Sequence, residues 1–250
     1  LARGLIDSIA KLAPEAGVTL MEVCGTHTVA IARNGIRNLM PECVRLSSGP
    51  GCPVCVTSNR DIDAVIALAR IPGVTIATFG DMTRVPGSTS SLLKEQAAGR
   101  SVQICYSPLD ALALAKANPD REIVFVGVGF ETTAPAVAGA VLAARQKKLD
   151  NFCVLSCHKL VPPALRALLD NDEGRYECDI DAFLLPGHGA VVLGLEPFRF
   201  VAETYGRPAV VAGFEPADIL GALCLIVERL RAGRPEAANA YGRAVDEGGS

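Results

Sequence analysis

Two pairs of residues in the first quarter of the sequence have the types and spacing needed for metal or redox chemistry. Cys52 and Cys55 lie three residues apart within Gly49-Pro50-Gly51-Cys52-Pro53-Val54-Cys55, a loop with two prolines and two glycines. Cys24 and His27, also three residues apart, lie upstream of that loop. Thiols at this spacing can share a metal ion or close a disulfide.

Three interpretations of these four side chains stay open at this point. Cys52 and Cys55 can form a redox dithiol, activated by a helix start near Asn59. Alternatively, Cys24, His27, Cys52 and Cys55 can form a structural zinc site, whose ligands usually come as two close pairs. In the third interpretation, Cys24 holds iron transiently and the Cys52/Cys55 pair relays electrons. A rigid turn with incidental cysteines is the least economical explanation.

Further polar residues follow predicted strands, where ligands of parallel α/β sheets bind. They include Glu131, His158 and His188, and we expect all three histidines of the chain to lie in such loops. Glu131 either faces the ligand or only fastens a neighbouring loop. Cys157 and His158 are adjacent and point to different sides, so they are a poor nucleophile pair. We expect His158 and Lys159 to bind an anion or a partner.

Several common enzyme classes lack support. The segment Gly127-Val128-Gly129-Phe130-Glu131-Thr132 lacks the third glycine of a dinucleotide fingerprint. The sequence also contains neither a P-loop nor a Gly-x-Ser-x-Gly elbow, so it offers nothing for nucleotide-phosphate or hydrolase chemistry.

The composition limits the possible domain organisation, partners and cellular compartment. Half of the residues are hydrophobic, enough for one large or two small domains. The net charge is −3 and no basic run occurs, which argues against nucleic acid as a partner. No apolar run approaches the length of a membrane span, and no signal peptide is evident. The nine cysteines are mostly scattered, as expected in a reducing cytoplasm.

Short apolar runs alternate with helical patterns, which predicts an α/β fold with parallel sheets. The expected strands are Thr19–Val23, Val44–Ser47, Val74–Phe79, Val102–Tyr106, Ile123–Val128, Phe152–Ser156, Ala182–Leu185 and Ala209–Ala212. The expected helices include Asn59–Arg70, Asp110–Ala117, Pro135–Lys147, Pro162–Leu169 and Pro216–Leu230.

A weak internal recurrence favours two similar sheets over one. Glycine followed by an acidic residue ends the strands at Gly80-Asp81, Gly129-Phe130-Glu131 and Gly213-Phe214-Glu215. We therefore expect one domain over residues 1–106 and a second over 107–206. Residues 207–250 are expected to return to the first domain.

The motifs together resemble the HypD family of hydrogenase maturation factors. The resemblance is carried in order by Met21–Thr28 (MEVCGTHT), Ser48–Thr57 (SGPGCPVCVT), Phe79–Gly87 (FGDMTRVPG), Ser107–Leu112 (SPLDAL), Gly129–Pro135 (GFETTAP), His158–Pro163 (HKLVPP), Pro186–His188 (PGH) and Val211–Pro216 (VAGFEP). These motifs extend over nearly the whole chain, and the first two together are highly specific.

The resemblance implies a scaffold for assembling the Fe(CN)₂CO unit of [NiFe]-hydrogenase, built from two similar α/β domains that face a cleft. It implies a HypC-type chaperone and the HypE/HypF cyanide donors as partners. It implies further that Cys24 binds the iron, that Cys52 and Cys55 are redox-active, and that His27 belongs to the Cys-Gly-Gly-His motif. A thiolate is a suitable soft ligand for such iron.

The sequence departs from the family pattern in two places. Thr26 stands where the family usually has the second glycine of Cys-Gly-Gly-His, and Val29 stands where it often has a histidine. Family members also continue into a domain with a [4Fe-4S] cluster on four cysteines. After Cys178 this sequence contains only Cys224, so the ligands of that cluster are absent from it. We expect the sequence to be either truncated or from a divergent branch, and as written it should be unable to feed electrons to Cys52 and Cys55 from a cluster of its own.

Overall fold

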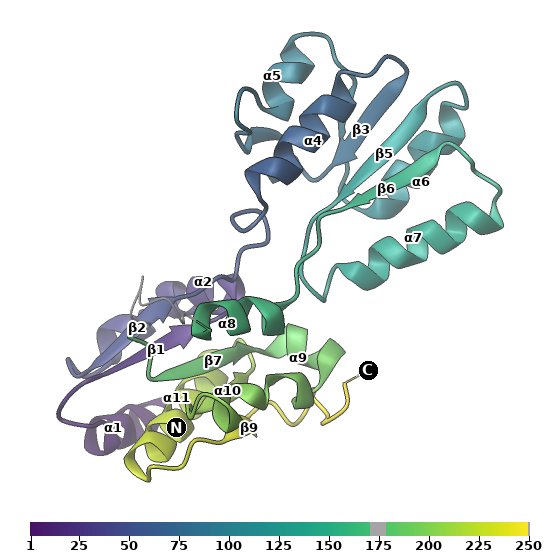
Figure 1. The fold of residues 1–250 in the computed structure, drawn as a ribbon. Helices are drawn as coiled ribbons and strands as arrows, with labels where there is room; N and C mark the ends of the chain where they lie inside the picture. Colours follow the sequence, from purple (N-terminus) through teal and green to yellow (C-terminus); the bar gives the residue numbers. More distant parts are fainter. Residues whose placement is uncertain (171–178, 250) are drawn as a thin grey trace. The chain divides into compact units, whose positions relative to one another are not determined.

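The computed structural model describes residues 1–170 and 179–249. It divides the chain into two compact units. Unit 1 contains Leu1–Cys52 and Leu160–Ser250, and unit 2 is the inserted segment Pro53–Lys159. Each unit is an α/β body with its own parallel sheet (Figure 1).

The units begin and end at other residues than the sequence pattern suggested. The chain leaves unit 1 after Cys52 and returns at Leu160, so the predicted boundaries near residues 106 and 206 are wrong. The reason is strand pairing: the strand beginning at Val74 pairs with the strands beginning at Val102 and Glu122, and not with the first strand of the chain. The predicted return of the chain to the first domain does occur, but earlier than expected.

Within the described part of unit 1, the sheet has the strand order β2-β1-β7-β8-β9, with every pairing parallel. Its strands are β1 (Val18–Glu22), β2 (Val44–Ser48), β7 (Ala182–Pro186), β8 (Ala209–Ala212) and β9 (Ala237–Asn239). Its helices are α1 (Ala2–Leu12), α2 (Gly25–Arg33), α3 (Ile36–Leu39), α8 (Val161–Leu169), α9 (Gly187–Leu193), α10 (Phe200–Glu203) and α11 (Pro216–Arg231), with a 3-10 turn η2 at Glu196–Phe198.

Alternation along the strands divides the core of unit 1 between the two sheet faces. Leu20, Leu184 and Val210 point to one face and pack with residues of α1, α2 and α11. Phe183 and Leu185 point to the other face and are also completely buried. Burial on both faces explains why these strands are continuous apolar runs in the sequence.

The described sheet of unit 2 has the order β4-β3-β5-β6 and is also parallel throughout. Its strands are β3 (Val74–Thr78), β4 (Val102–Ile104), β5 (Glu122–Gly127) and β6 (Phe152–Ser156). Its helices are α4 (Asn59–Ala69), α5 (Leu92–Ala97), α6 (Pro108–Ala117) and α7 (Ala134–Gln146), with a 3-10 turn η1 at Gly80–Arg84. Residues of α4 and α5 pack on one face, whereas α6 and α7 cover the other (Figure 1).

Both units wind in the same way. In each, the chain makes a first strand, adds its second strand on one side, and then crosses to the other side of the first strand. The winding therefore reverses between β1 and β7 in unit 1, and between β3 and β5 in unit 2. Parallel sheets bind their ligands beyond the carboxyl ends of the strands at such reversals.

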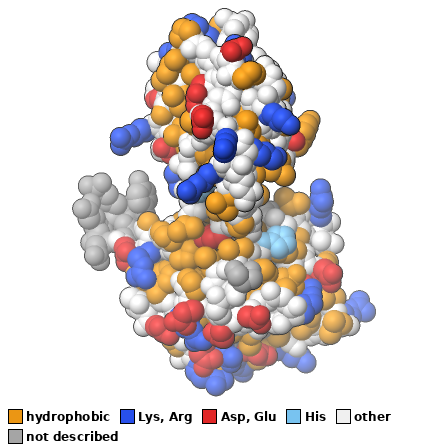
Figure 2. Space-filling view, turned by 90° about the vertical axis from the view of Figure 1, so that its right-hand side faces the viewer, with side chains coloured by type: hydrophobic (Ala, Val, Ile, Leu, Met, Phe, Trp, Pro, Cys, Tyr) orange, Lys and Arg blue, Asp and Glu red, His pale blue; other side chains and the backbone are white. Residues whose placement is uncertain are grey.

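The structure confirms the predicted α/β class with two parallel sheets. Each predicted strand is present within about two residues of its predicted limits, which is the usual precision of boundaries. Strand β9 was missed because its Ala-Ala-Asn sequence lacks β-branched residues. No helix of the described residues is long and apolar enough to cross a membrane. On the face shown in Figure 2, basic and acidic side chains are interspersed.

Candidate functional site

The predicted chemistry of unit 1 gathers at the carboxyl edge of its sheet. Cys24 lies two residues after the end of β1, the loop Gly49–Cys52 follows β2, and His188 follows β7. Phe214 comes after β8, the next strand along the sheet. This edge includes the reversal between β1 and β7, so it is the expected ligand-binding edge of unit 1.

Two glycines allow the loop after β2 to contact the end of β1 closely. A Cβ atom added to Gly51 would lie 2.5 Å from Gly25 N and 2.8 Å from Cys24 Cα. The Gly25 N–H donates a hydrogen bond to the Gly51 carbonyl at 3.3 Å, and the Gly49 N–H donates to the Glu22 carbonyl at 2.8 Å. Backbone therefore lies on backbone, which brings Cys52, the next residue, beside Cys24.

Cys24 occupies the N-cap position of α2. Its carbonyl accepts the first helical hydrogen bond, from the Thr28 N–H at 3.1 Å, and the residue is half-buried. The partial positive charge of a helix N-terminus favours an anion at this position. Cysteine sulfur is a suitable ligand for a soft metal ion.

Glu22 is a buried carboxyl that the sequence analysis missed. Its side chain is 1% exposed, and its Oε1 accepts hydrogen bonds from Ser48 Oγ at 2.8 Å and from Arg37 Nη2 at 3.2 Å. Burial raises the pKa of Glu22 above its usual value, although these hydrogen bonds act in the opposite direction. The signal in the sequence is an acidic residue at the end of an otherwise apolar run, two positions before Cys24.

His27 lies in the first turn of α2 and is completely buried. Its Nε2 is 2.9 Å from the Gly213 carbonyl oxygen, which can only accept, so Nε2 carries the proton. Burial lowers the pKa of His27 to about 4, so the ring is neutral and Nδ1 bears a lone pair. Nδ1 has no hydrogen-bond partner among the described residues.

An aromatic contact links His27 with His188. The His27 ring stacks on Phe214 with a centroid distance of 4.6 Å, and the His188 ring lies 4.1 Å from the same phenyl ring. His188 is exposed and belongs to the first turn of α9. The prediction that all three histidines lie in loops is therefore correct only for His158, since His27 and His188 each begin a helix.

The predicted residues of unit 2 follow its own strands. Glu131 comes after β5 and is 2% exposed. His158 comes after β6, with its Nδ1 2.9 Å from Ser156 Oγ. Lys159 Nζ lies 3.2 Å from Asp61 Oδ2, so this amine already has a carboxylate partner. The roles of Glu131 as a catalytic residue and of His158 as a ligand-binding residue stay predictions.

The dithiol lies where the chain passes from one unit to the other. Cys52 is the last residue of its segment in unit 1 and is half-buried, whereas Cys55 belongs to unit 2 and is exposed. The loop is braced by a hydrogen bond from Thr57 Oγ1 to the Pro53 carbonyl at 2.8 Å. Among the described residues, no three His, Cys, Asp or Glu side chains gather as metal ligands.

The remaining described cysteines suit structural roles. Cys105, Cys157 and Cys224 are buried, and burial raises the pKa of each thiol. Cys153 is exposed rather than packed, and its thiol donates to Glu122 Oε1 at 2.9 Å. That hydrogen bond raises the pKa of Cys153 to about 11, so the thiol stays protonated. Cys178 lies outside the described residues.

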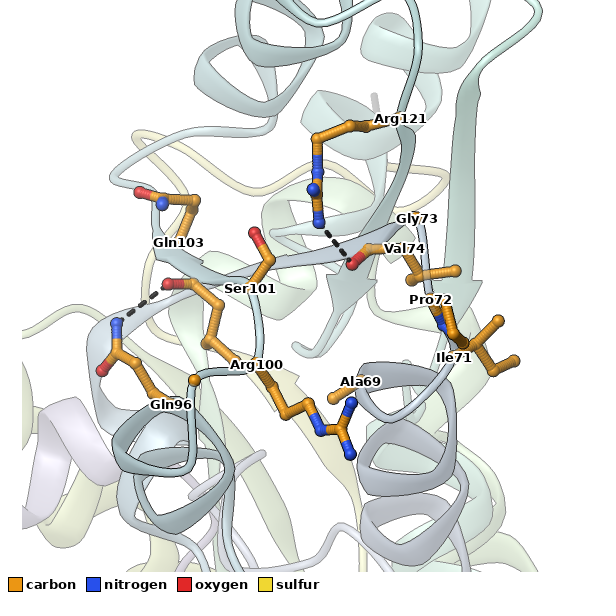
Figure 3. A pocket seen from close by; sticks show the side chains of 12 residues that line it. Ala69, Ile71, Pro72, Gly73, Val74, Gln96, Arg100, Ser101, Gln103 and Arg121 are labelled. Carbon is orange, nitrogen blue, oxygen red and sulfur yellow. Dashed lines mark hydrogen bonds between the residues drawn. The ribbon is translucent and has the colours of Figure 1, made fainter.

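A cavity of about 530 Å³ lies at the opposite, amino edge of unit 2 (Figure 3). Its lining residues come from α4, from α5 and from the segments around the starts of β3, β4 and β5, and they include Arg100 and Arg121. Arg121 donates from Nε to Thr75 Oγ1 at 2.7 Å and from Nη2 to the Val74 carbonyl at 3.1 Å. These bonds brace the start of β3, so Arg121 has a structural role here.

Comparisons with known proteins agree with the motifs. The family model HypD, described as "Hydrogenase formation hypA family", matches residues 1–250. The hydrogenase maturation factor HypD of Rhizobium leguminosarum bv. viciae is 47% identical over 249 residues, which cover 98% of this chain and 65% of that protein.

Two further relatives carry the same name. Those of Rhodobacter capsulatus and Escherichia coli (strain K12) are 45% and 44% identical over 256 and 236 residues. The matches cover 100% and 94% of this chain and 67% and 62% of the relatives, so the chain spans about two thirds of their length. With a family match from end to end and identities of this size, the chain belongs to the HypD family of hydrogenase maturation factors.

Proposed function

We propose that this chain is a scaffold on which the Fe(CN)₂CO unit of [NiFe]-hydrogenase is assembled and from which it is passed on. The iron is the cargo, and the thiolate of Cys24 is its ligand on this chain. Family membership supplies the role in hydrogenase maturation. The position of Cys24 at the carboxyl edge of unit 1, at a helix N-terminus, supports its role as the ligand.

The observation that carries the proposal is the contact of Gly51 with Cys24 and Gly25. This contact brings the backbone of Cys52, the next residue, close to the proposed iron ligand, which supports a role of the Cys52/Cys55 pair at the iron. Oxidation of two thiols to a disulfide releases two electrons and two protons. The pair can therefore act as a two-electron donor next to the iron while its ligands are attached.

The proposed partners follow from the family. A HypC-type chaperone would supply a second thiol to the iron, and the HypE/HypF pair would supply cyanide. Cys52 and Cys55 then need re-reduction by an electron donor after each oxidation.

The test is anaerobic co-purification with HypC, followed by infrared spectroscopy and metal analysis of the complex. We expect cyanide and carbon monoxide stretching bands with bound iron, and we expect Cys24→Ala to lose both. Cys43→Ala is the matched control, since Cys43 is also half-buried in unit 1 but precedes β2 at the opposite sheet edge. Unchanged iron content in Cys24→Ala would reject the proposal.

The same variants separate the scaffold from a thiol–disulfide oxidoreductase. An oxidoreductase would turn over a small disulfide in a manner that depends on Cys52 and Cys55 but not on Cys24. Turnover retained in Cys24→Ala, together with an absence of iron in the wild-type complex, would favour the oxidoreductase.

A further inference from the structure

The turn after β9 reaches the same edge of unit 1 as His27. The Ala240 N–H donates to the Val211 carbonyl at 2.9 Å, which extends the pairing of β9 with β8. The Tyr241 N–H donates to Asn239 Oδ1 at 2.8 Å, and Asn239 Nδ2 donates to the Val245 carbonyl at 2.7 Å. These bonds fix the turn and place the Tyr241 ring next to the loops that follow β7 and β8.

The Tyr241 ring lies against two glycines where no side chain would fit. A Cβ atom on Gly187 would come within 3.1 Å of Tyr241 Cδ1, and one on Gly213 would come within 2.7 Å of Tyr241 Cε2. Gly187 directly precedes His188, and Gly213 supplies the carbonyl that binds His27. The Tyr241 ring thus packs on the loops after β7 and β8, which carry His188 and Phe214.

A bidentate ion pair lies against the same side of Gly213 as the Tyr241 ring. Arg243 donates to both carboxylate oxygens of Asp218, at 2.8 Å and 2.6 Å, and its guanidinium lies 4.6 Å from the Tyr241 ring centroid. A Cβ atom on Gly213 would also collide with the same carboxylate, so Asp218 packs on this glycine as well. Asp218 belongs to the first turn of α11, which follows the loop directly.

We propose that Tyr241, Asp218 and Arg243 are positioning residues that hold the Gly213 carbonyl against Nε2 of His27. By fixing that hydrogen bond, they select the tautomer whose Nδ1 keeps its lone pair. This buried nitrogen is then a ready hydrogen-bond acceptor, three residues from Cys24. The role of that acceptor at the iron rests on the proposed function, whereas the selection of the tautomer does not.

The experiment reads the tautomer directly in the full chain. Long-range ¹H–¹⁵N correlation spectra of ¹⁵N-labelled protein distinguish a protonated ring nitrogen from one with a lone pair. The chain has three histidines, so His158→Gln and His188→Gln assign the signals of His27 by elimination. We expect His27 of the wild type to be protonated at Nε2 only.

Variants of the ion pair and of the ring supply the test. We expect Arg243→Gln and Tyr241→Ala to shift the His27 nitrogen signals toward the other tautomer. We expect Tyr241→Phe to leave them in place, because the packing on the glycines uses the ring. Arg243→Lys keeps the positive charge, so its His27 nitrogen signals should lie closer to those of the wild type than the signals of Arg243→Gln do. Arg199→Gln is the matched control, since Arg199 forms a comparable ion pair with Glu247 in the same unit.

Two results would overturn the assignment. One is a wild-type His27 protonated at Nδ1, and the other is a folded Arg243→Gln or Tyr241→Ala protein with unchanged His27 signals. If both of these variants fail to fold, the tautomer of His27 in the wild type and the His27 signals of Arg243→Lys still test the assignment. Iron retention with HypC is read separately: a shifted tautomer with full iron retention removes His27 from the iron chemistry and leaves the positioning assignment intact.

Discussion

At the scale of single residues, Gly51 is a close steric constraint on the proposed iron site. We predict that Gly51→Ala costs about 1–3 kcal/mol of unfolding free energy, because the atoms in the way belong to backbone and cannot rotate aside. Denaturant unfolding measures this loss, and iron retention should fall with it because the loop must move away from Cys24.

Gly221→Ala serves as the control for the added methyl group. Gly221 lies in α11 of the same unit, and its Cβ would meet nothing within 4 Å. Alanine is the better helix former, so this variant should be as stable as the wild type or more so. Equal losses in the two variants would contradict the packing argument.

The buried His27 predicts a dependence of stability on pH. Its folded pKa of about 4 lies below the ordinary value of 6.5, so the unfolded chain takes up the proton first as the pH falls. The contribution of neutral His27 to the free energy of unfolding is complete above pH 6.5. It is lost between pH 6.5 and about 4, with a total on the order of 3 kcal/mol. Below about pH 4 the free energy of unfolding no longer changes through His27.

Urea unfolding of the wild type and of His27→Gln across this range checks the prediction. Groups other than His27 titrate in both proteins and cancel in the comparison. The curve of the wild type should fall more steeply toward acid than that of the variant. Two parallel curves would show that the proton is taken up equally in the folded and unfolded chains.

The sequence could predict which residues lie at strand ends, but not how they are held. Cys24, Cys52 and His188 lie at the carboxyl edge of unit 1, as their positions after apolar runs indicated. Glu22 was missed because one acidic residue in a short strand gives no hint of Ser48 and Arg37. Tyr241 was missed because its contacts come from distant parts of the chain.

At the scale of secondary structure elements, local signals were sufficient for eight strands and for the helices predicted by range, but not for β9, α2 or α9. Ser107 begins α6 with a capping box, in which its Oγ accepts from the Asp110 N–H at 3.3 Å and Asp110 accepts from the Ser107 N–H at 2.9 Å. Prolines in the first turn mark α6, α7, α8 and α11. Such signals depend on neighbouring residues, which explains why the predicted limits agree with the structure.

The capping box gives a prediction at this scale. Ser107→Ala should lower the unfolding free energy of unit 2 by about 1 kcal/mol, because the Asp110 N–H loses its acceptor. Ser107→Asp retains a side-chain acceptor and should stay close to the wild type. Chemical denaturation of both variants checks this, and equal losses would mean that the cap is not the source of the effect.

At the scale of the whole molecule, the sequence could not show which strands share a sheet. Strand pairing joins residues far apart in the chain, as in β1 with β7, and no local pattern records the choice of partner. The motifs gave the family, and through it the two-domain architecture. The division at Cys52 and Leu160 needed the structure.

The division predicts that unit 2 folds alone. Its core clusters contain only residues between Val54 and Cys157, and the core cluster of unit 1 contains none of them. A fragment of residues 53–159 should therefore unfold cooperatively and give dispersed amide signals in NMR spectra. A fragment without these properties would mean that unit 1 is needed to complete its core.

The shared strand order also has an evolutionary consequence. Duplication of one α/β unit, with the copy inserted into the loop after β2 of the original, would produce this arrangement. Counted from the strand ends, Cys24 after β1 corresponds to Gly80 after β3, and His188 after β7 corresponds to Gly129 after β5. The inserted copy thus has glycines where the original has its thiol and imidazole. Under such a duplication both copies would have retained the strand order, whereas the thiol and the imidazole at these positions occur in unit 1 alone.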